Sequence, residues 1–269
     1  MRPAAAVTAL DEIRERIETA DRIVVALDFD GTLAPICENP GDAAVPEESL
    51  GVLRSLSEVP GVTLAIVSGR SLADLKSRIE LPAFYVGNHG LEIEGPRLSY
   101  VHEGGGEFRE AVDLACWDLR AAFQAVPGVL VEPKGMTATL HYRQAPTSLS
   151  GWIEATARMV ISPYRPVLTL EPALKSWEVR PRVDWNKGTA LEFLLQHAAA
   201  ADPLLVFAGD DVGDEVMFDC RPNAISIKVG GQVGTQARYR VENPAELIEL
   251  LRCLTAAAGI PRVLCGHSG

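Results

Sequence analysis

Short apolar runs alternate with amphipathic stretches along most of the chain. Residues 23–27 are all apolar and lead into Asp28, which predicts a buried strand over 23–28. The same pattern predicts further strands and, between them, helices with one apolar face: strands over 62–67, 83–87, 204–208 and 224–228, and helices over 8–20, 46–58, 71–80, 187–199, 213–220 and 243–257. Strands that alternate with helices are typical of a doubly wound parallel sheet with helices on both faces, so we expect an α/β fold.

The middle of the chain follows a different pattern. A helix followed by two strands is predicted twice there: helix 107–125 with strands 128–132 and 137–143, then helix 150–161 with strands 167–171 and 175–180. We therefore expect an inserted α+β cap over residues 93–180, within a core formed by residues 1–92 and 181–269. Two chain crossings would join cap and core, which suits a lid over a binding site. The tail from residue 262 is expected to be mobile.

Composition and charge narrow the classes of partner. The 269 residues are 47% hydrophobic and 23% charged, which predicts a water-soluble protein with an extensive core. The formal net charge of −11 argues against nucleic acid and anionic membrane surfaces, and no apolar run suits a membrane span or a signal peptide. The five cysteines, at 37, 116, 220, 253 and 265, form no Cys-x-x-Cys pair, which predicts reduced thiols. We expect a cytoplasmic monomer that acts on a small molecule.

The first candidate for chemistry is a pair of acids at the end of strand 23–28. Asp28 and Asp30 lie two positions apart, on the same side of extended chain, and Gly31 lets the backbone turn away. Two close carboxylates repel unless a cation or a shared proton separates them, so the pair implies a hard metal such as Mg²⁺. A plain Asp-Gly turn is the alternative. A calcium loop is excluded because Leu33 would occupy its required glycine position.

Three further segments place polar residues at predicted strand ends or helix starts: Ser68-Gly69-Arg70, Lys187, and the acidic run with Asp210, Asp211 and Asp214. A hydroxyl and a guanidinium can hold an oxyanion, although Ser68 serves equally well as a helix cap. Acids at a helix start partly reflect the helix dipole, and a lone lysine is usually solvated. Their shared edge of the sheet favours one common site, because ligands bind beyond the carboxyl ends of parallel strands.

These segments resemble the haloacid dehalogenase-like phosphotransferase superfamily. Asp28-Phe29-Asp30-Gly31-Thr32 matches its first motif, Ser68 its second, Lys187 its third, and Gly209 through Asp214 its fourth. Within the superfamily the chain is most similar to the trehalose-6-phosphate phosphatases, through Val67–Arg70, Gly87–Glu92, Glu132–Lys134, His141–Arg143, Lys175–Pro181 and Trp185–Gly188. Gly213 and Asn186 depart from that family, which usually has Thr and often Asp there, but neither position is expected to do chemistry.

The resemblance implies roles for the residues of the core. Asp28 would attack phosphorus to form an aspartyl-phosphate, and Asp30 would act as general acid and then as general base. Asp28, the carbonyl of Asp30 and Asp210 would bind Mg²⁺, with Asp211 and Asp214 completing or orienting that shell. The phosphoryl oxygens and the adjoining substrate would be held by the remaining core residues: Ser68, Lys187, Gly31, Gly69, Arg70 and Asn88. Asn88 is expected to touch either the substrate or the cap, and His89 to pack nearby.

The cap would supply specificity for the sugar. The candidates alternate acids and bases that suit the hydroxyl groups of a sugar: Glu132, Lys134, Arg143, Lys175 and Glu178. Glu132 and Lys134 share one face of extended chain, whereas Lys175 and Glu178 share a face only if the strand bends. Ion pairing across an exposed sheet is the alternative explanation of these charges.

Taken together, the resemblance implies a Mg²⁺-dependent phosphatase that hydrolyses trehalose 6-phosphate to trehalose and phosphate. A phosphatase for another sugar phosphate, such as sucrose phosphate or a glycosyl-phosphoglycerate, stays open because specificity resides in the cap. A mutase is conceivable, although it would need to shield the phosphoryl group from water. A non-catalytic sugar-phosphate sensor is a further alternative, but it predicts loss of the nucleophile or the metal-binding acids, and these are all present.

Overall fold

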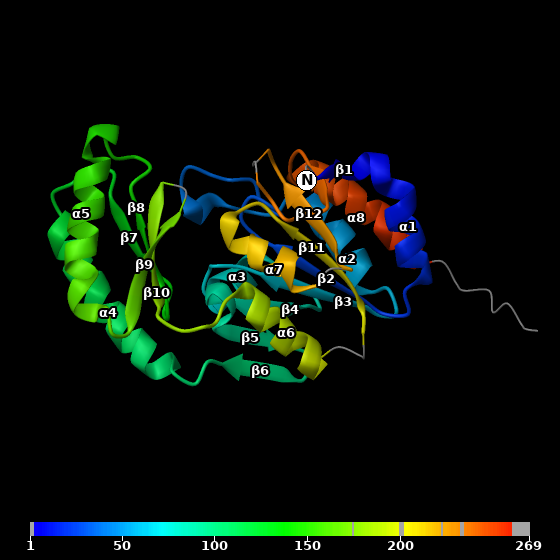
Figure 1. The fold of residues 1–269 in the computed structure, drawn as a ribbon, viewed down its shortest axis with the longest axis horizontal. Coiled ribbons are helices and arrows are strands. Elements are labelled where there is room, and N and C mark those ends of the chain that lie inside the picture. Colours follow the sequence, from blue (N-terminus) through cyan, green and yellow to red (C-terminus); the bar gives the residue numbers. More distant parts are fainter. Residues whose placement is uncertain (1–2, 174, 199–201, 222, 232–233, 260–269) are drawn as a thin grey trace, which may run out of the picture.

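The structure is a computed structural model that describes residues 3–173, 175–198, 202–221, 223–231 and 234–259. A larger α/β unit and a smaller α+β unit lie next to each other along the long axis of the molecule (Figure 1). The tail from residue 262, for which we predicted mobility, lies outside the described residues. Within the described part of the chain, no helix has both the length and the apolar character needed to cross a membrane.

The larger unit is built on a nine-stranded sheet in the order β1-β13-β12-β11-β2-β3-β4-β5-β6. In that order the strands span Ala4–Ala5, Tyr239–Val241, Ile225–Val229, Leu204–Gly209, Ile23–Asp28, Val62–Val67, Phe84–Gly87, Glu92–Gly95 and Leu98–Val101. The first seven strands pair in parallel, and β5 and β6 extend the sheet as an antiparallel hairpin. The predicted doubly wound α/β fold is confirmed.

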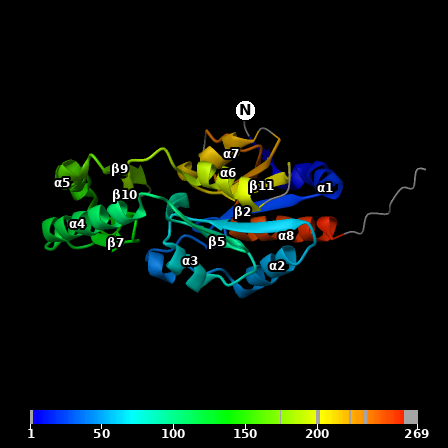
Figure 2. The same ribbon diagram turned by 90° about the horizontal axis from the view of Figure 1, so that it is seen from below.

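Helices cover both faces of this sheet because alternate residues of a strand point to opposite sides. The helices span Leu10–Thr19 (α1), Glu47–Ser57 (α2), Leu72–Arg78 (α3), Lys187–Ala198 (α6), Glu215–Cys220 (α7) and Pro244–Ala258 (α8). Val25 and Leu27 of β2 belong to the core cluster that includes α1, α2, α3 and α8, whereas Val24 and Ala26 belong to the cluster with α6 and α7. Figure 2 shows α6 and α7 on one side and α2, α3 and α8 on the other.

The smaller unit repeats a helix followed by two strands, as predicted. Its elements are α4 (Gly105–Phe123), β7 (Leu130–Pro133), β8 (Ala138–His141), α5 (Ser150–Ile161), β9 (Leu168–Ala173) and β10 (Ser176–Pro181). The strands form an antiparallel sheet in the order β7-β8-β10-β9, and apolar side chains of α4 and α5 pack against it in a separate core. The sequence pattern therefore located this unit correctly in kind and in element order.

The β5–β6 hairpin, however, was not predicted, and it moves the boundary between the two units. We expected the cap to begin at residue 93, but β5 pairs with β4 and so belongs to the larger sheet. Ile93 is fully buried in the core beneath α6, while its neighbours Glu92 and Glu94 are polar. Because polar residues flank Ile93 on both sides, the sequence pattern did not predict this strand. We propose that the cap begins after β6, in the segment that leads into α4.

Candidate active site

The carboxyl ends of β2 and β11 bring three acids together. Asp28 ends β2, and Asp210 and Asp214 follow β11, which is its direct neighbour in the sheet. One carboxylate oxygen from each of these residues lies within 4.8 Å of the others. Asp28 and Asp214 are buried, at 4% and 0% exposure. The sheet topology therefore assembles residues that are more than 180 positions apart in the sequence.

Lys187 bridges two of these acids, Asp28 and Asp214. It is the first residue of α6, and its Nζ lies 2.7 Å from Asp28 Oδ1 and 2.7 Å from Asp214 Oδ1. Burial alone would lower the pKa of this ammonium group, but Asp214 and Asp28 raise it well above its ordinary value. Lys187 is thus a buried cation that orients Asp28, and the solvated-surface alternative is excluded.

The cluster holds three acidic groups and one ammonium group. Burial and the nearby Asp214 raise the pKa of Asp28 well above its ordinary value, against the opposing effect of Lys187. Burial, Asp214 and Asp211 likewise raise the pKa of Asp210 to about 7. Three carboxylates that share one ammonium group are stabilised by a divalent cation, and oxygen donors are those that Mg²⁺ prefers. The donor set therefore fits Mg²⁺.

Two glycines make room for the acids. Gly31 has φ +78°, and a Cβ atom there would lie 2.1 Å from Asp210 Oδ2. At Gly209 a Cβ atom would lie 2.5 Å from Asp214 Oδ2. Gly31 was predicted as a flexible turn next to the substrate, and the structure adds a steric reason, because any side chain there would displace the carboxylate of Asp210.

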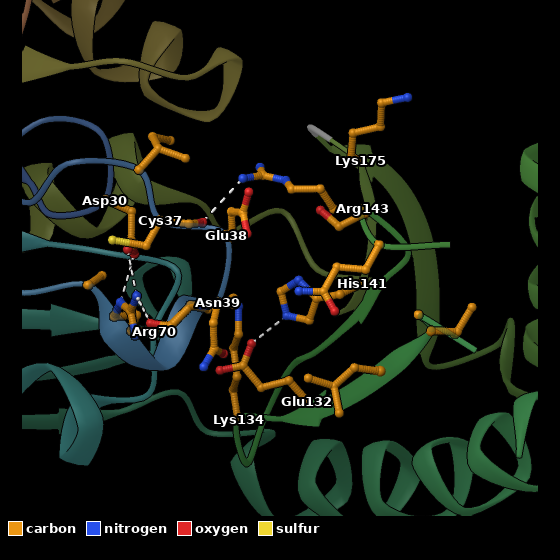
Figure 3. A pocket seen from close by; sticks show the side chains of 18 residues that line it. Asp30, Cys37, Glu38, Asn39, Arg70, Glu132, Lys134, His141, Arg143 and Lys175 are labelled. Atoms are coloured by element: carbon orange, nitrogen blue, oxygen red, sulfur yellow. Dashed lines mark hydrogen bonds and ion pairs between the residues drawn. The ribbon is translucent and has the colours of Figure 1, made fainter. Parts of the chain in front are cut away.

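Asp30 does not join this cluster through its carboxylate. Arg70 holds both carboxylate oxygens, with Nη2 2.6 Å from Oδ1 and Nε 2.8 Å from Oδ2 (Figure 3). The expected convergence of the Asp28 and Asp30 side chains on one cation is therefore wrong, and only the Asp30 carbonyl stays a predicted ligand. The carboxylate instead lines a cavity, where a general acid has to be.

Arg70 was expected to hold an oxyanion of the substrate. Besides Asp30, its guanidinium donates to Asp74 at 2.8 Å and to the carbonyl of Pro40 at 2.9 Å, and the residue is 4% exposed. Burial opposes the charged form, but Asp30 and Asp74 raise the pKa of Arg70 above its ordinary value. The main contacts of Arg70 are thus within the protein, and it orients Asp30. Sequence reasoning missed this because spacing along the chain does not show which carboxylates surround Arg70.

The loops after β3 and β4 contact each other at the carboxyl edge of the large sheet. Ser68 is buried at the end of β3, where its Oγ accepts a hydrogen bond from the Arg70 backbone N–H at 3.1 Å. A Cβ atom at Gly69 would lie 2.6 Å from the His89 ring, so Gly69 is needed to accommodate that imidazole. Because these contacts are internal, the predicted substrate contacts of Ser68 and Gly69 stay predictions.

Asn88 contacts the cap. It is fully buried, its Nδ2 donates to Glu92 at 2.6 Å, and its Oδ1 accepts from the cap residue Thr137 at 2.7 Å. Of the two contacts that we expected for Asn88, the structure therefore supports the one with the cap. Burial lowers the pKa of the neighbouring His89, which lies 3.4 Å from Glu178 of β10.

A cavity of about 530 Å³ lies between the core and the cap (Figure 3). Its core wall includes Asp30, Arg70 and the loop that follows β2, and its cap wall carries most of the charged side chains predicted to bind sugar: Glu132, Lys134, Arg143 and Lys175. The carboxylate of Glu132 also lies 2.7 Å from Nε2 of His141. Lys175 has φ +57°, which places it at the β9–β10 turn.

Glu178, the fifth predicted sugar ligand, is not among the residues that line this cavity. Its carboxylate accepts from Thr139 Oγ1 at 2.8 Å and lies 3.7 Å from Lys134 Nζ. Burial opposes ionisation, but Lys134 and His89 lower the pKa of Glu178 well below its ordinary value. Glu178 therefore positions Lys134 and contacts the core. Its direct role in sugar binding is not supported by this geometry.

Asp211 and Asp214 differ in their surroundings. Asp211 is exposed and caps the short helical turn at 212–214, where its Oδ1 accepts from Val212 N. Asp214 is buried and accepts from both Lys187 and the Asp211 backbone. In the described part of the chain, the acid cluster includes Asp214 and not Asp211, so Asp211 is better explained as a helix cap.

Sequence reasoning also missed Lys228, the second buried lysine of the site. Its Nζ lies 2.6 Å from the carbonyl oxygen of Asp210, and only 1% of its surface is exposed. The available signal was a lysine inside a strand, Ile225–Val229, whose other members are apolar or small. A charged residue in a buried strand needs a partner, so the pattern indicates that Lys228 contacts other polar groups inside the protein.

The comparisons with known proteins agree with this geometry. A sequence profile of the trehalose-phosphatase family matches residues 26–245, which include all the residues of the acid cluster. The chain belongs to this family. The trehalose-phosphate phosphatase of Mycobacterium marinum is 35% identical over 242 residues, which cover 86% of this chain and 61% of that protein. The chain therefore spans less than two thirds of the length of this trehalose-phosphatase relative.

Solved structures show the same fold. The C-terminal domain of the C. albicans trehalose-6-phosphate phosphatase has a TM-score of 0.80 at 22% identity, over 95% of this chain and 98% of that domain. A haloacid dehalogenase-like hydrolase from B. subtilis has a TM-score of 0.53 at 16% identity, over 85% of this chain and 98% of that protein. The chain thus has a haloacid dehalogenase-like fold, as its motifs implied.

Proposed function

We propose that the protein is a Mg²⁺-dependent phosphomonoester hydrolase whose substrate is trehalose 6-phosphate. One observation carries this proposal: the Asp28–Lys187–Asp210–Asp214 cluster lies at the end of the strand that leads directly to Asp30, and Asp30 lines a cavity walled by charged cap residues. The acid cluster on the core side supports phosphoryl transfer there, and the charged residues on the cap side support binding of sugar hydroxyls. Family membership supports the same reaction.

The chain's own residues account for both steps of the reaction. Lys187 holds Oδ1 of Asp28, which leaves Oδ2 to attack phosphorus. As the O–P bond forms, the bond from phosphorus to the sugar oxygen breaks, and Asp30 gives that oxygen a proton. In the second step Asp30 takes a proton from water, the water attacks the phosphorus, and Asp28 is released. Arg70 keeps the Asp30 carboxylate in one orientation throughout.

The bound metal would be held by Asp28, Asp210 and the carbonyl of Asp30, and would offset negative charge on the phosphoryl oxygens. Asp214 contacts Lys187 directly, so it serves to orient the ammonium group as well as to adjust the charge of the site. Binding of Mg²⁺ would also offset the burial and the carboxylate repulsion that together raise the pKa of Asp28 and Asp210.

We further propose that the cap wall binds the sugar. Lys134 and Glu132 lie on the part of the wall that faces Arg70, and Arg143 donates to the carbonyl of Cys37 on the opposite wall at 3.2 Å. Charged donors and acceptors of this kind form strong hydrogen bonds to hydroxyl groups. The contact between Arg143 and the core loop joins this wall of the cap to the core.

The direct test is phosphate release from a panel of sugar phosphates in the presence of Mg²⁺. We expect the highest kcat/KM with trehalose 6-phosphate, and no release after chelation of the metal. A higher kcat/KM for sucrose phosphate or for a glycosyl-phosphoglycerate would show that this compound, and not trehalose 6-phosphate, is the preferred substrate. Tight binding of trehalose 6-phosphate without any release would instead favour a sensor. A cytoplasmic location and a monomeric state stay predictions of the sequence.

A further inference from the structure

Lys228 is a buried cation for which the proposed reaction gives no direct role. It lies in β12 and pairs in register with Gly209 at the end of β11, one residue before Asp210. Its Nζ lies 2.6 Å from the carbonyl oxygen of Asp210 and 3.4 Å from that of Asp211. The ammonium group therefore holds the backbone of the 210–211 loop. The side chain of Asp210 in this loop belongs to the acid cluster.

Lys228 also has an acidic neighbour, Glu215. Glu215, the first residue of α7, lies 3.7 Å from the Nζ atom. The same glutamate accepts hydrogen bonds from Gln236 N at 2.8 Å and from Thr235 Oγ1 at 3.1 Å. Burying an ammonium group is costly unless its donors are satisfied, so this lysine is held by two backbone carbonyls and one carboxylate.

We propose that Lys228 is a positioning residue for the metal-binding carboxylate of Asp210. Lys228 holds the carbonyls of the 210–211 loop and so keeps the Asp210 carboxylate within the acid cluster. There the carboxylate lies next to Gly31, which has no side chain to displace it. The inference rests on the proposed function for the identity of the cation, Mg²⁺. It adds that the geometry of the metal site depends on a residue of the neighbouring strand that is not itself a ligand.

A charge-removing variant tests this role without relying on turnover. Lys228→Met keeps the length and the apolar stem of the side chain but removes all its donors. We expect Mg²⁺ alone, titrated into the purified full-length protein in a calorimeter, to bind about 10- to 100-fold more weakly, as when other partners of metal ligands are removed. The Mg²⁺-induced rise in Tm should shrink accordingly. Lys76→Met is the control, because Lys76 is exposed and pairs with Glu94 of β5, which lies three strands away from β2 in the sheet.

A second variant separates positioning from folding. Lys228→Met leaves the Glu215 carboxylate without its cation, so the double variant Lys228→Met/Glu215→Gln removes both charges while the amide oxygen still accepts from Gln236. A folded double variant with weakened Mg²⁺ binding supports the proposal. If both variants fail to fold, Lys228 serves the fold and the proposal is overturned.

The outcomes distinguish this inference from the proposed function. Unchanged Mg²⁺ affinity in folded Lys228→Met protein overturns the positioning role and leaves the proposed function intact. Weakened Mg²⁺ binding in the variant supports the positioning role. If the wild type at the same time does not hydrolyse trehalose 6-phosphate, the proposed substrate is wrong. A wild-type protein that binds no Mg²⁺ overturns both.

Discussion

At the scale of single residues, the site depends on buried charges whose partners come from distant segments. Asp28, Lys187 and Asp210 were predicted from their positions at strand ends and helix starts, because parallel strands present those positions at one edge. The pairing of Asp30 with Arg70 was not predictable in the same way, because both residues lie at that edge and spacing does not reveal which group each one faces. Side-chain partners follow from packing and not from order along the chain.

Glu178 gives a pH prediction at this scale. Its pKa lies below the ordinary value of 4.5 in the folded protein, so the folded state binds fewer protons than the unfolded state in acid. Its stabilising contribution is therefore present above about pH 4.5 and is lost as the pH falls below that value. Glu178→Gln should lower the free energy of unfolding at neutral pH by about 1.5–3 kcal/mol, the size of a lost charged hydrogen bond.

The measurement is the free energy of unfolding of both proteins as a function of pH. The gap between wild type and Glu178→Gln should narrow as the pH falls through the acid range. Glu171→Gln is a suitable control, because Glu171 pairs with Arg180 at the more exposed edge of the same sheet. A gap of constant size at every pH would show that Glu178 acts through packing and not through its charge.

At the scale of elements, the sequence pattern predicted the buried strands better than the exposed ones. β2 and β3 begin and end at the predicted residues, since both are apolar runs that reach the core. The β5–β6 hairpin was missed because half of its residues are polar or exposed, and such alternation is shared with loops. The short strands β1 and β13 were missed for their length, which is too small for any periodicity.

The β7–β8 hairpin carries the prediction for sugar recognition. Lys134 follows β7 and lines the cavity, so Lys134→Ala should lower kcat/KM for trehalose 6-phosphate by about tenfold to a hundredfold, through loss of a charged hydrogen bond. Hydrolysis of a small aryl phosphate, which lacks the sugar, should stay near the wild-type rate. Lys187→Ala should impair both reactions, because it holds the nucleophile that both substrates need.

The control for this comparison is Arg14→Ala, since Arg14 lies on α1 and pairs with the exposed Glu18 of the same helix. It should leave both substrates unaffected. Equal losses on both substrates in Lys134→Ala would mean that Lys134 closes or stabilises the cap, and the sugar-binding role would have to be abandoned. Steady-state phosphate release on the two substrates provides the comparison.

At the scale of the whole molecule, function depends on how the cap meets the core. The sequence predicted both units and their order, but not the contacts between them, such as the buried hydrogen bond from Thr137 to Asn88. Asn88 and His89 both have positive φ values, of 48° and 56°, so the core loop that meets the cap has an uncommon backbone conformation. The resemblance named this loop as a motif, and the structure supplies its physical role as a contact between the two units.

The central claim for the whole molecule is that Asp28 attacks phosphorus. It is tested most directly by quenching turnover of trehalose 6-phosphate with borohydride, which reduces an acyl phosphate to an alcohol, and by mapping the product by peptide mass spectrometry. We predict homoserine at position 28, dependent on both substrate and Mg²⁺, and none in Asp28→Asn protein. Steady release of phosphate with an unmodified Asp28, or with the modification at another residue, would contradict the mechanism.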